Sequence, residues 1–396
     1  MELIRIIIYA SIYIGLVTTT FFILSFFSNK KKGELKPLSD SQLPKVTILI
    51  PAYNEEIGII KTINSALGSN YPKDKFEVIV IDDGSKDKTL ELAKSIKDNS
   101  LQIFSKPNGG KASALNLGIS KAKGEIIFTM DADTVIDKDS VKRMVQLFQE
   151  EDVVAVSPTM ITTKPQTICQ RVQYVEYLMG LFLRKVFSGI DSIYISPGAF
   201  SAYKKSFFEK YGGYKVGNIT EDLEMSLRIQ SNHFKIRNCP EAIAYTTPPR
   251  GFKELLIQRR RWYVGLIKNT IDYKHMFSRK YGDLGMFIFP LSWITTLMSI
   301  IITCTVFFRT IFDVKKELLF LKLIQFKFFD QVSFNLFAVE RFVYILEGKI
   351  EANIGDNRYS LVKGDTLYFE SSLPHYFRNT GIGEARLISV TTPPSV

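Results

Sequence analysis

The chain has few of the residues that build disulfide frameworks or zinc sites. Its three cysteines, Cys169, Cys239 and Cys304, lie far apart without CxxC spacing, and only three histidines are present among 396 residues. The sequence therefore argues against a disulfide-stabilised or zinc-dependent fold. Any catalytic metal would have to be bound by carboxylates, the ligands that hard divalent cations prefer.

The chain also lacks a continuous stripe of basic residues, although its net charge is +11. Much of the positive charge is concentrated at residues 30–32 and 259–280, next to apolar segments. This pattern is typical of the charge that flanks membrane spans, so we expect contact with membrane lipids and no nucleic-acid partner.

Two apolar segments are long enough to cross a bilayer. Residues 6–27 contain only small hydroxyls as interruptions, and residues 284–308 contain Pro290, which a membrane helix tolerates. The alternative for the first segment is a secretory signal peptide. Because both basic clusters lie between the two segments, we expect a multi-pass protein of the cell membrane, with spans in 1–28 and 284–310 and residues 29–283 in the cytoplasm.

Residues 45–156 alternate short β-rich apolar runs with helical stretches. This alternation predicts an α/β domain with right-handed βαβ units and a doubly wound parallel sheet covered on both faces. Ligands of such sheets bind beyond the carboxyl ends of the strands. The expected strands are residues 46–50, 77–81, 101–104, 125–130 and 153–156.

Polar motifs follow four of these expected strands. One Asp-Gly turn after a strand is ordinarily only a turn, but four motifs at neighbouring strand ends favour a ligand site. The motifs are Pro51-Ala52-Tyr53-Asn54-Glu55-Glu56, Asp82-Asp83-Gly84-Ser85, Asn108-Gly109-Gly110-Lys111 and Asp131-Ala132-Asp133.

The chemistry of these motifs fits a nucleotide-diphosphate sugar. The Asp83 carboxylate can accept the imide N–H of uracil, with the backbone of residues 54–55 framing the base. Asp131 and Asp133 can hold Mg²⁺ or Mn²⁺ together with the diphosphate oxygens. Lys111, which follows two glycines at a helix start, adds positive charge near the phosphates, although a solvated surface lysine is the plainer alternative.

Thr220-Glu221-Asp222 precedes a predicted helix at residues 223–229. Acids in a first helical turn can serve only as capping residues. The functional interpretation makes Glu221 and Asp222 catalytic, with Asp222 as the general base that removes the proton of the acceptor hydroxyl. A single in-line displacement would invert the anomeric carbon.

Gln258-Arg259-Arg260-Arg261-Trp262 lies in an amphipathic stretch, residues 252–273, next to the second apolar segment. Such a helix can lie on anionic lipid. Alternatively, Arg259 and Arg261 bind the donor diphosphate while Trp262 stacks on an acceptor sugar. The two interpretations are compatible because they use different faces of the helix.

Residues 45–291 resemble the family 2 glycosyltransferases, in particular the membrane-integrated branch of cellulose, chitin, hyaluronan and poly-N-acetylglucosamine synthases. The motifs at 82–85, 131–133, 220–222 and 258–262 occur in that family's order. The resemblance implies a GT-A fold, uracil recognition at Asp83, metal at Asp133, a base at Asp222, and substrate contacts from Gln258, Arg261 and Trp262. Pro197-Gly198-Ala199-Phe200 also resembles the acceptor-side loop of that branch.

The sequence thus predicts an inverting, metal-dependent transfer from a UDP-sugar to a saccharide, at the cytoplasmic face of a membrane. The alternatives are a polyprenyl phosphate acceptor and a non-catalytic sugar-sensing membrane protein. Processive synthases of this branch carry several helices after the Gln-Arg-Trp motif. Here residues 320–345 are broken by charges, so the sequence does not predict processivity.

From about residue 341 the sequence becomes all-β, with short alternating strands separated by glycines. Residues 364–379 resemble the second motif of a cupin, but Arg341 stands where the first motif would supply a glutamate. We therefore expect His375 to be a hydrogen-bonded barrel histidine, not a metal ligand. We also expect a junction over 311–340, a fusion point near 330–345, and a partial barrel over 341–396 that is poorly ordered or pairs with another copy in a homo-oligomer.

Overall fold

The structure is a computed structural model, and it describes residues 2–28, 36–163, 165–312, 340–355, 357–370 and 375–392. Two compact units make up the chain, residues 1–298 and 299–396. Most of the predicted fusion region near 330–345, and almost all of the predicted junction over 311–340, lie outside the described residues.

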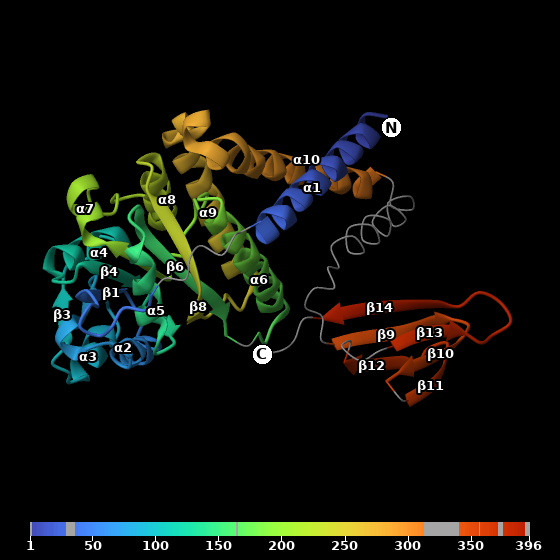
Figure 1. The fold of residues 1–396 in the computed structure, drawn as a ribbon, viewed down its shortest axis with the longest axis horizontal. Coiled ribbons are helices and arrows are strands. Elements are labelled where there is room, and N and C mark those ends of the chain that lie inside the picture. Colours follow the sequence, from blue (N-terminus) through green and yellow to red (C-terminus); the bar gives the residue numbers. More distant parts are fainter. Residues whose placement is uncertain are drawn as a thin grey trace. The chain divides into compact units, whose positions relative to one another are not determined.

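An eight-stranded sheet forms the centre of the first unit, in the order β3-β2-β1-β4-β7-β6-β8-β5 (Figure 1). Strands β1 to β4 pair in parallel, as the sequence predicts. The strands are β1 (Val46–Ala52), β2 (Phe76–Asp82), β3 (Leu101–Ser105), β4 (Ile126–Met130), β5 (Val135–Ile136), β6 (Val153–Thr162), β7 (Phe200–Lys204) and β8 (Lys235–Thr246).

The expectation of an all-parallel sheet is wrong, because the sheet is mixed. Strand β7 lies antiparallel between β4 and β6, and β5 pairs antiparallel with β8. Neither β7 nor β8 was predicted: β8 contains Lys235, Arg237 and Glu241, and its sequence lacks the apolar run that marks a buried strand.

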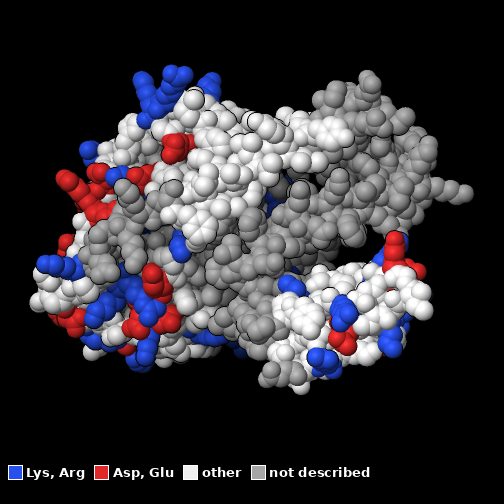
Figure 2. Space-filling view, turned by 45° about the vertical axis from the view of Figure 1, so that its right-hand side comes forward, with Lys and Arg blue, Asp and Glu red and all other residues white. Residues whose placement is uncertain are grey.

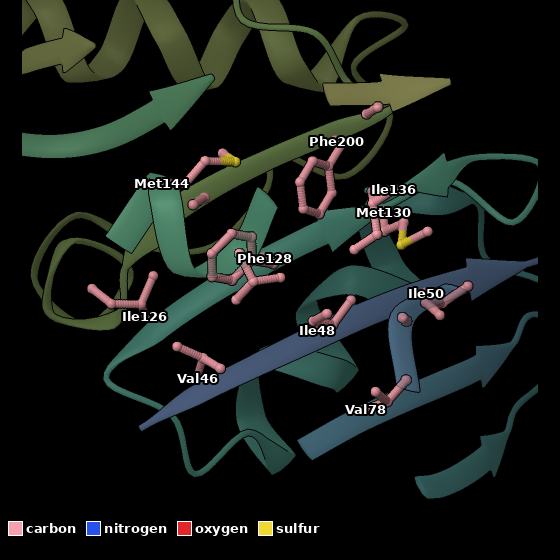
Figure 3. Packing of buried hydrophobic residues seen from close by; sticks show 14 of the residues in the cluster. Val46, Ile48, Ile50, Val78, Ile126, Phe128, Met130, Ile136, Met144 and Phe200 are labelled. Carbon is pink, nitrogen blue, oxygen red and sulfur yellow. The ribbon is translucent and has the colours of Figure 1, made fainter. Parts of the chain in front are cut away.

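Helices cover both faces of the sheet, as expected. Along β1, Ile48 and Ile50 point into one core and Leu49 into the other, because alternate strand residues face opposite sides. Figure 3 shows the first core between the sheet and α5. The first core contains α2 (Ile59–Leu67), α3 (Thr89–Ser95) and α5 (Ser140–Gln146), and the second contains α4 (Lys111–Lys121), α7 (Lys205–Tyr211) and α8 (Glu221–Ser231).

Two long helices, α6 (Ile168–Gly189) and α9 (Phe252–Asp272), follow strands β6 and β8 in the chain. Helix α6 begins with a capping box of Thr167 and Gln170. Helix α9 matches the predicted amphipathic stretch. The remaining helical segments are α1 (Glu2–Ser28), α10 (Phe289–Phe312), the short turns η1 (Lys73–Lys75), η2 (Leu147–Gln149), η3 (Lys274–Met276) and η4 (Arg279–Tyr281), and a π-helical turn η5 (Leu284–Ile288).

Two helical stretches among the described residues are long and apolar enough to cross a membrane, Tyr9–Phe27 and Leu284–Thr305. Helix α1 packs against α6 through aromatic pairs that include Phe22 with Phe187 and Phe26 with Phe182. On the face that Figure 2 displays, basic and acidic side chains of the described residues are intermixed.

The second unit contains two antiparallel sheets of three strands, β11-β10-β13 and β12-β9-β14. Its core includes Val343, Ile345 and Ala352. The strands are β9 (Glu340–Glu347), β10 (Lys349–Ile354), β11 (Asn357–Val362), β12 (Thr366–Glu370), β13 (His375–Asn379) and β14 (Arg386–Thr392).

His375 is hydrogen-bonded in the structure, as expected, because its Nε2 lies 2.8 Å from Nη1 of Arg341. The side chain of Arg341 therefore occupies the place where the resemblance to cupins would put a metal-binding glutamate. The expectation that this unit lacks strands needed to close a barrel stays a prediction.

Candidate active site

A cavity of about 1150 Å³ opens beyond the carboxyl ends of β1, β2 and β4. It brings together all the predicted site residues except Asn54 and Asp82. The predicted residues that line it are Pro51, Ala52, Tyr53, Glu55, Asp83, Lys111, Asp131, Asp133, Glu221, Asp222, Gln258, Arg259, Arg261 and Trp262.

Asn54 and Asp82 hold the loops that form one wall of this cavity. The carboxylate of Asp82 is buried and accepts hydrogen bonds from the backbone N–H of Ser85 and the hydroxyl of Ser105. The Asn54 amide oxygen accepts from the backbone N–H of Lys86, and the Asn54 N–H donates to Ser85 Oγ. Of these two residues, both predicted to bind the donor, Asn54 joins the loop after β1 to the loop after β2, whereas Asp82 joins the loop after β2 to the end of β3.

The carboxylate of Asp83 fixes the turn that precedes α4. Its Oδ1 accepts from Lys106 Nζ at 2.7 Å and from the Gly109 N–H at 3.0 Å, while its Oδ2 accepts from the Gly110 N–H at 2.7 Å. Gly110 has a φ of 84°, which favours glycine. Asp83 thus sets the position from which Lys111 enters the cavity.

Lys111 forms the centre of a charge network inside the cavity. Its ammonium lies 2.6 Å from Asp131 Oδ1 and 3.0 Å from Glu221 Oε1, and it donates to the carbonyl of Gly198 at 3.3 Å. Burial disfavours the charge, but Asp131 and Glu221 outweigh burial and raise the pKa of Lys111. The alternative of a solvated surface lysine does not describe this position.

Three carboxyl groups near the end of β4 repel one another. Burial and the charge of Asp131 raise the pKa of Asp133. Burial, together with Asp133, Asp131 and Asp87, raises the pKa of Glu55 to about 7. A divalent cation would offset this repulsion, so the residues fit the predicted metal. No group of three or more potential metal ligands occurs among the described residues, so Asp131 and Asp133 would need donor phosphate oxygens to complete the coordination.

The pKa values of Glu221 and Asp222, the first two residues of α8, are shifted in opposite directions. Burial and the charge of Glu221 raise the pKa of Asp222 to about 6. Glu221 is also buried, but Lys111 holds its pKa below the usual value. Two carboxyl groups whose pKa values are separated in this way are typical of acid–base sites.

The loop before β7 passes close to the Asp222 carboxylate. A Cβ atom on Gly198 would lie 2.7 Å from Asp222 Oδ2, so only glycine leaves room at this position. The 197–200 loop that resembles the family's acceptor loop therefore contacts the predicted base.

Helix α9 supplies the remaining predicted residues, and α6 holds two of them. Gln258 Oε1 accepts a hydrogen bond of 2.6 Å from Gln173, and Arg259 is ion-paired with Glu176. The Arg259 guanidinium also lies 4.5 Å from the ring centroid of Trp262. The Arg259 guanidinium, the Trp262 indole and the Gln258 amide thus line the cavity together.

Helix α6 also lines the cavity, which the sequence did not predict. Its residues Glu176, Tyr177, Gly180 and Arg184 line the cavity, although no motif marks them. Their spacing places them on one face of the helix, since residues three and four apart are neighbours. Polar and small residues at that spacing in a largely apolar helix were the feature from which these lining residues could have been predicted.

The chain is similar to known glycosyltransferases. The family model for glycosyl transferase family 2 matches residues 47–212, and a cupin domain model matches residues 338–391. The chain is 29% identical to a probable glycosyltransferase, YdaM, of Bacillus subtilis, over 79% of this chain and 76% of that protein. It is 32% identical to poly-beta-1,6-N-acetyl-D-glucosamine synthase of Staphylococcus aureus, over 60% of this chain and 58% of the synthase.

The fold is similar to that of a mannosyltransferase from Pyrobaculum calidifontis, solved with GDP-Man and Mn²⁺, with a TM-score of 0.60 and 21% identity. The alignment covers 79% of this chain and 89% of that one.

Fold and site together define a glycosyltransferase with a GT-A-like α/β domain. More specifically, residues 47–212 form a family 2 glycosyltransferase domain, and the C-terminal unit carries a cupin domain.

Proposed function

We propose that the protein transfers a sugar, with inversion, from a UDP-sugar to a saccharide acceptor in a reaction that requires Mg²⁺ or Mn²⁺. One observation carries this proposal: the carboxyl groups of Asp131, Asp133 and Asp222 line the same cavity. The name of the related poly-N-acetylglucosamine synthase supports a UDP-linked hexosamine as the first donor to test.

Asp222 is proposed as the general base. Its carboxyl group, with a pKa of about 6, is largely ionised at neutral pH and can take the proton of the acceptor hydroxyl. Glu221 and Lys111 are proposed to set its pKa, because the charge of Glu221 raises this pKa and the charge of Lys111 lowers it. As the base removes the proton, the hydroxyl oxygen attacks the anomeric carbon opposite the leaving diphosphate.

Asp131 and Asp133 are proposed to hold the metal, which supplies positive charge to the leaving diphosphate when bound. Arg261 lies close enough to Glu221 to influence its pKa, which supports a role at the diphosphate side of the cavity. Trp262 offers a flat aromatic surface for the acceptor sugar.

We further propose that the reaction takes place at the cytoplasmic face of a cell membrane. The two apolar helical stretches support this location, together with the basic residues beside them.

The test is release of UDP from purified full-length protein in detergent, with Mn²⁺, Mg²⁺ or a chelator. We expect turnover only with a divalent cation, and a loss of about 10²-fold or more in Asp222→Asn. The exposed Glu209→Gln serves as a matched carboxylate control with unchanged rate. Turnover that survives chelation, or an active Asp222→Asn variant, would contradict the proposal.

A further inference from the structure

Two of the three guanidinium nitrogens of Arg184 are buried and have no hydrogen-bond partner in the part of the chain that the structure describes. These are the Nε and Nη2 atoms, which are inaccessible to solvent. A buried guanidinium without an anion is costly, and such groups are ordinarily paired. Two other cations that line the cavity, Lys111 and Arg259, are paired with a carboxylate or an aromatic ring.

The surroundings keep this guanidinium in place. It folds back along α6 over Gly180, where a Cβ would lie 3.6 Å from Nη1. Tyr177, one further turn back, lies within electrostatic range of both Arg184 and the Asp131 and Asp133 pair. Burial lowers the pKa of Arg184, with Tyr177 opposing this effect. The Arg184 guanidinium therefore lies on the cavity face of α6, on the same face as Tyr177.

The outer side of the same helical turns contacts a candidate membrane helix. Phe182 packs on Phe26 of α1 with ring centroids 5.6 Å apart, and Lys185 lies 4.7 Å above the same ring. Helix α6 thus lies between the cavity, which Arg184 lines, and the helix that is apolar enough to enter a bilayer.

We propose that Arg184 binds a phosphate group of a substrate, and so is a substrate-binding residue in addition to the predicted motifs. The proposal rests on the proposed function. A guanidinium is suited to phosphate because its planar donors match two phosphate oxygens. The phosphate can belong to a lipid-linked acceptor or to the donor diphosphate, and the experiment below separates these sources.

The experiment compares Arg184→Met with the unchanged full-length protein in detergent. Methionine keeps the aliphatic part of the side chain and removes the donors. Binding of three probes is titrated: UDP with Mn²⁺, a polyprenyl monophosphate and the uncharged polyprenol. Arg171→Met is the matched control, because Arg171 is an exposed arginine on α6 that does not line the cavity.

We expect Arg184→Met to weaken at least one phosphate probe by about 10- to 100-fold, the loss typical of one charged hydrogen bond, and to leave polyprenol unchanged. Weaker binding of polyprenyl phosphate alone assigns the lipid phosphate, and weaker UDP binding assigns the donor. Arg184→Lys should restore part of the affinity. Unchanged affinity for both phosphate probes would overturn the proposal.

Thermal unfolding without ligand distinguishes binding from a structural role. Because two nitrogens of the Arg184 guanidinium have no described hydrogen-bond partner, replacement of this residue by methionine should leave the melting temperature equal or higher. A lower melting temperature, with equal losses for polyprenol and polyprenyl phosphate, would show a structural role and overturn the proposal. Binding is measured without turnover, so a protein that fails to release UDP would refute the proposed function and leave this result to stand by itself.

Discussion

At the scale of single residues, a cation controls two neighbouring acids. Lys111 contacts Glu221 directly, whereas Asp222 is buried and repelled by Glu221. As a consequence, the Asp222 carboxyl group can act as a general base near neutral pH, a role that a histidine often has in other enzymes. The sequence indicated these residue types through their motifs, but only the folded structure brings residues 111, 131 and 221 together.

The pH dependence of transfer follows from this arrangement. A general base works only when deprotonated, so kcat/KM should fall as the pH decreases through about 6, the pKa of Asp222, and should level off above it. In Glu221→Gln the repulsive charge is gone, so the pKa of Asp222 should fall and the acidic limb should move to lower pH. Rates measured from pH 4.5 to 8.5 check both expectations.

Glu209→Gln, an exposed change on α7, should leave the profile in place. An acidic limb that stays unchanged in Glu221→Gln would assign it to a group other than Asp222, such as Glu55, whose pKa is also raised.

At the scale of elements, the contact between α8 and α9 positions the catalytic acids against the arginine-rich helix. Asn269 of α9 donates to Thr220 Oγ1 at 2.9 Å, and Gly265 lies against the same threonine. A Cβ at position 265 would lie 2.2 Å from Thr220 Oγ1. The two helices therefore approach closely only because residue 265 has no side chain.

Gly265→Ala should separate these helices. We expect a loss of about 1–3 kcal/mol in the free energy of unfolding, because the clash outweighs the gain in helix propensity, together with a lower kcat/KM. Chemical unfolding and UDP release check the two effects. Lys268→Ala, an exposed change on the same helix, is the control, and a Gly265→Ala protein with unchanged stability would show that α9 can shift freely.

The elements that the sequence predicted best were those with a clear period. Strands β1 and β2 and helix α9 match their expected ranges within two residues, because their apolar patterns are continuous. Strand β7 and helix α6 were missed: the former is short, and the latter carries apolar residues around most of its circumference. Arg184 was missed with its helix, since nothing local distinguishes it from a surface arginine.

At the scale of the whole molecule, the cupin unit has open sheet edges. Strands β11 and β13 border one described sheet, and β12 and β14 border the other. Tyr368 and Tyr376 are more than half exposed on these edge strands. Open edges favour pairing with another chain.

We therefore expect the full chain to be a homo-oligomer in detergent and a chain ending at residue 312 to be a monomer. Light scattering coupled to size-exclusion chromatography measures both masses, with UDP release as the control for an intact first unit. A monomeric full chain, or cooperative unfolding of isolated residues 335–396 as a monomer, would contradict this expectation.

The turn held by Asp83 links the two ends of the cavity. The Asp83 carboxylate, which is expected to bind the nucleobase, also accepts a hydrogen bond from the N–H of Gly110. The next residue, Lys111, places its ammonium against Asp131 and Glu221. A nucleobase that draws the Asp83 carboxylate away from this turn would shift the position of Lys111, and with it the electrostatic environment of Asp222. Different nucleotide donors would then differ more in kcat than in their Kd for the enzyme.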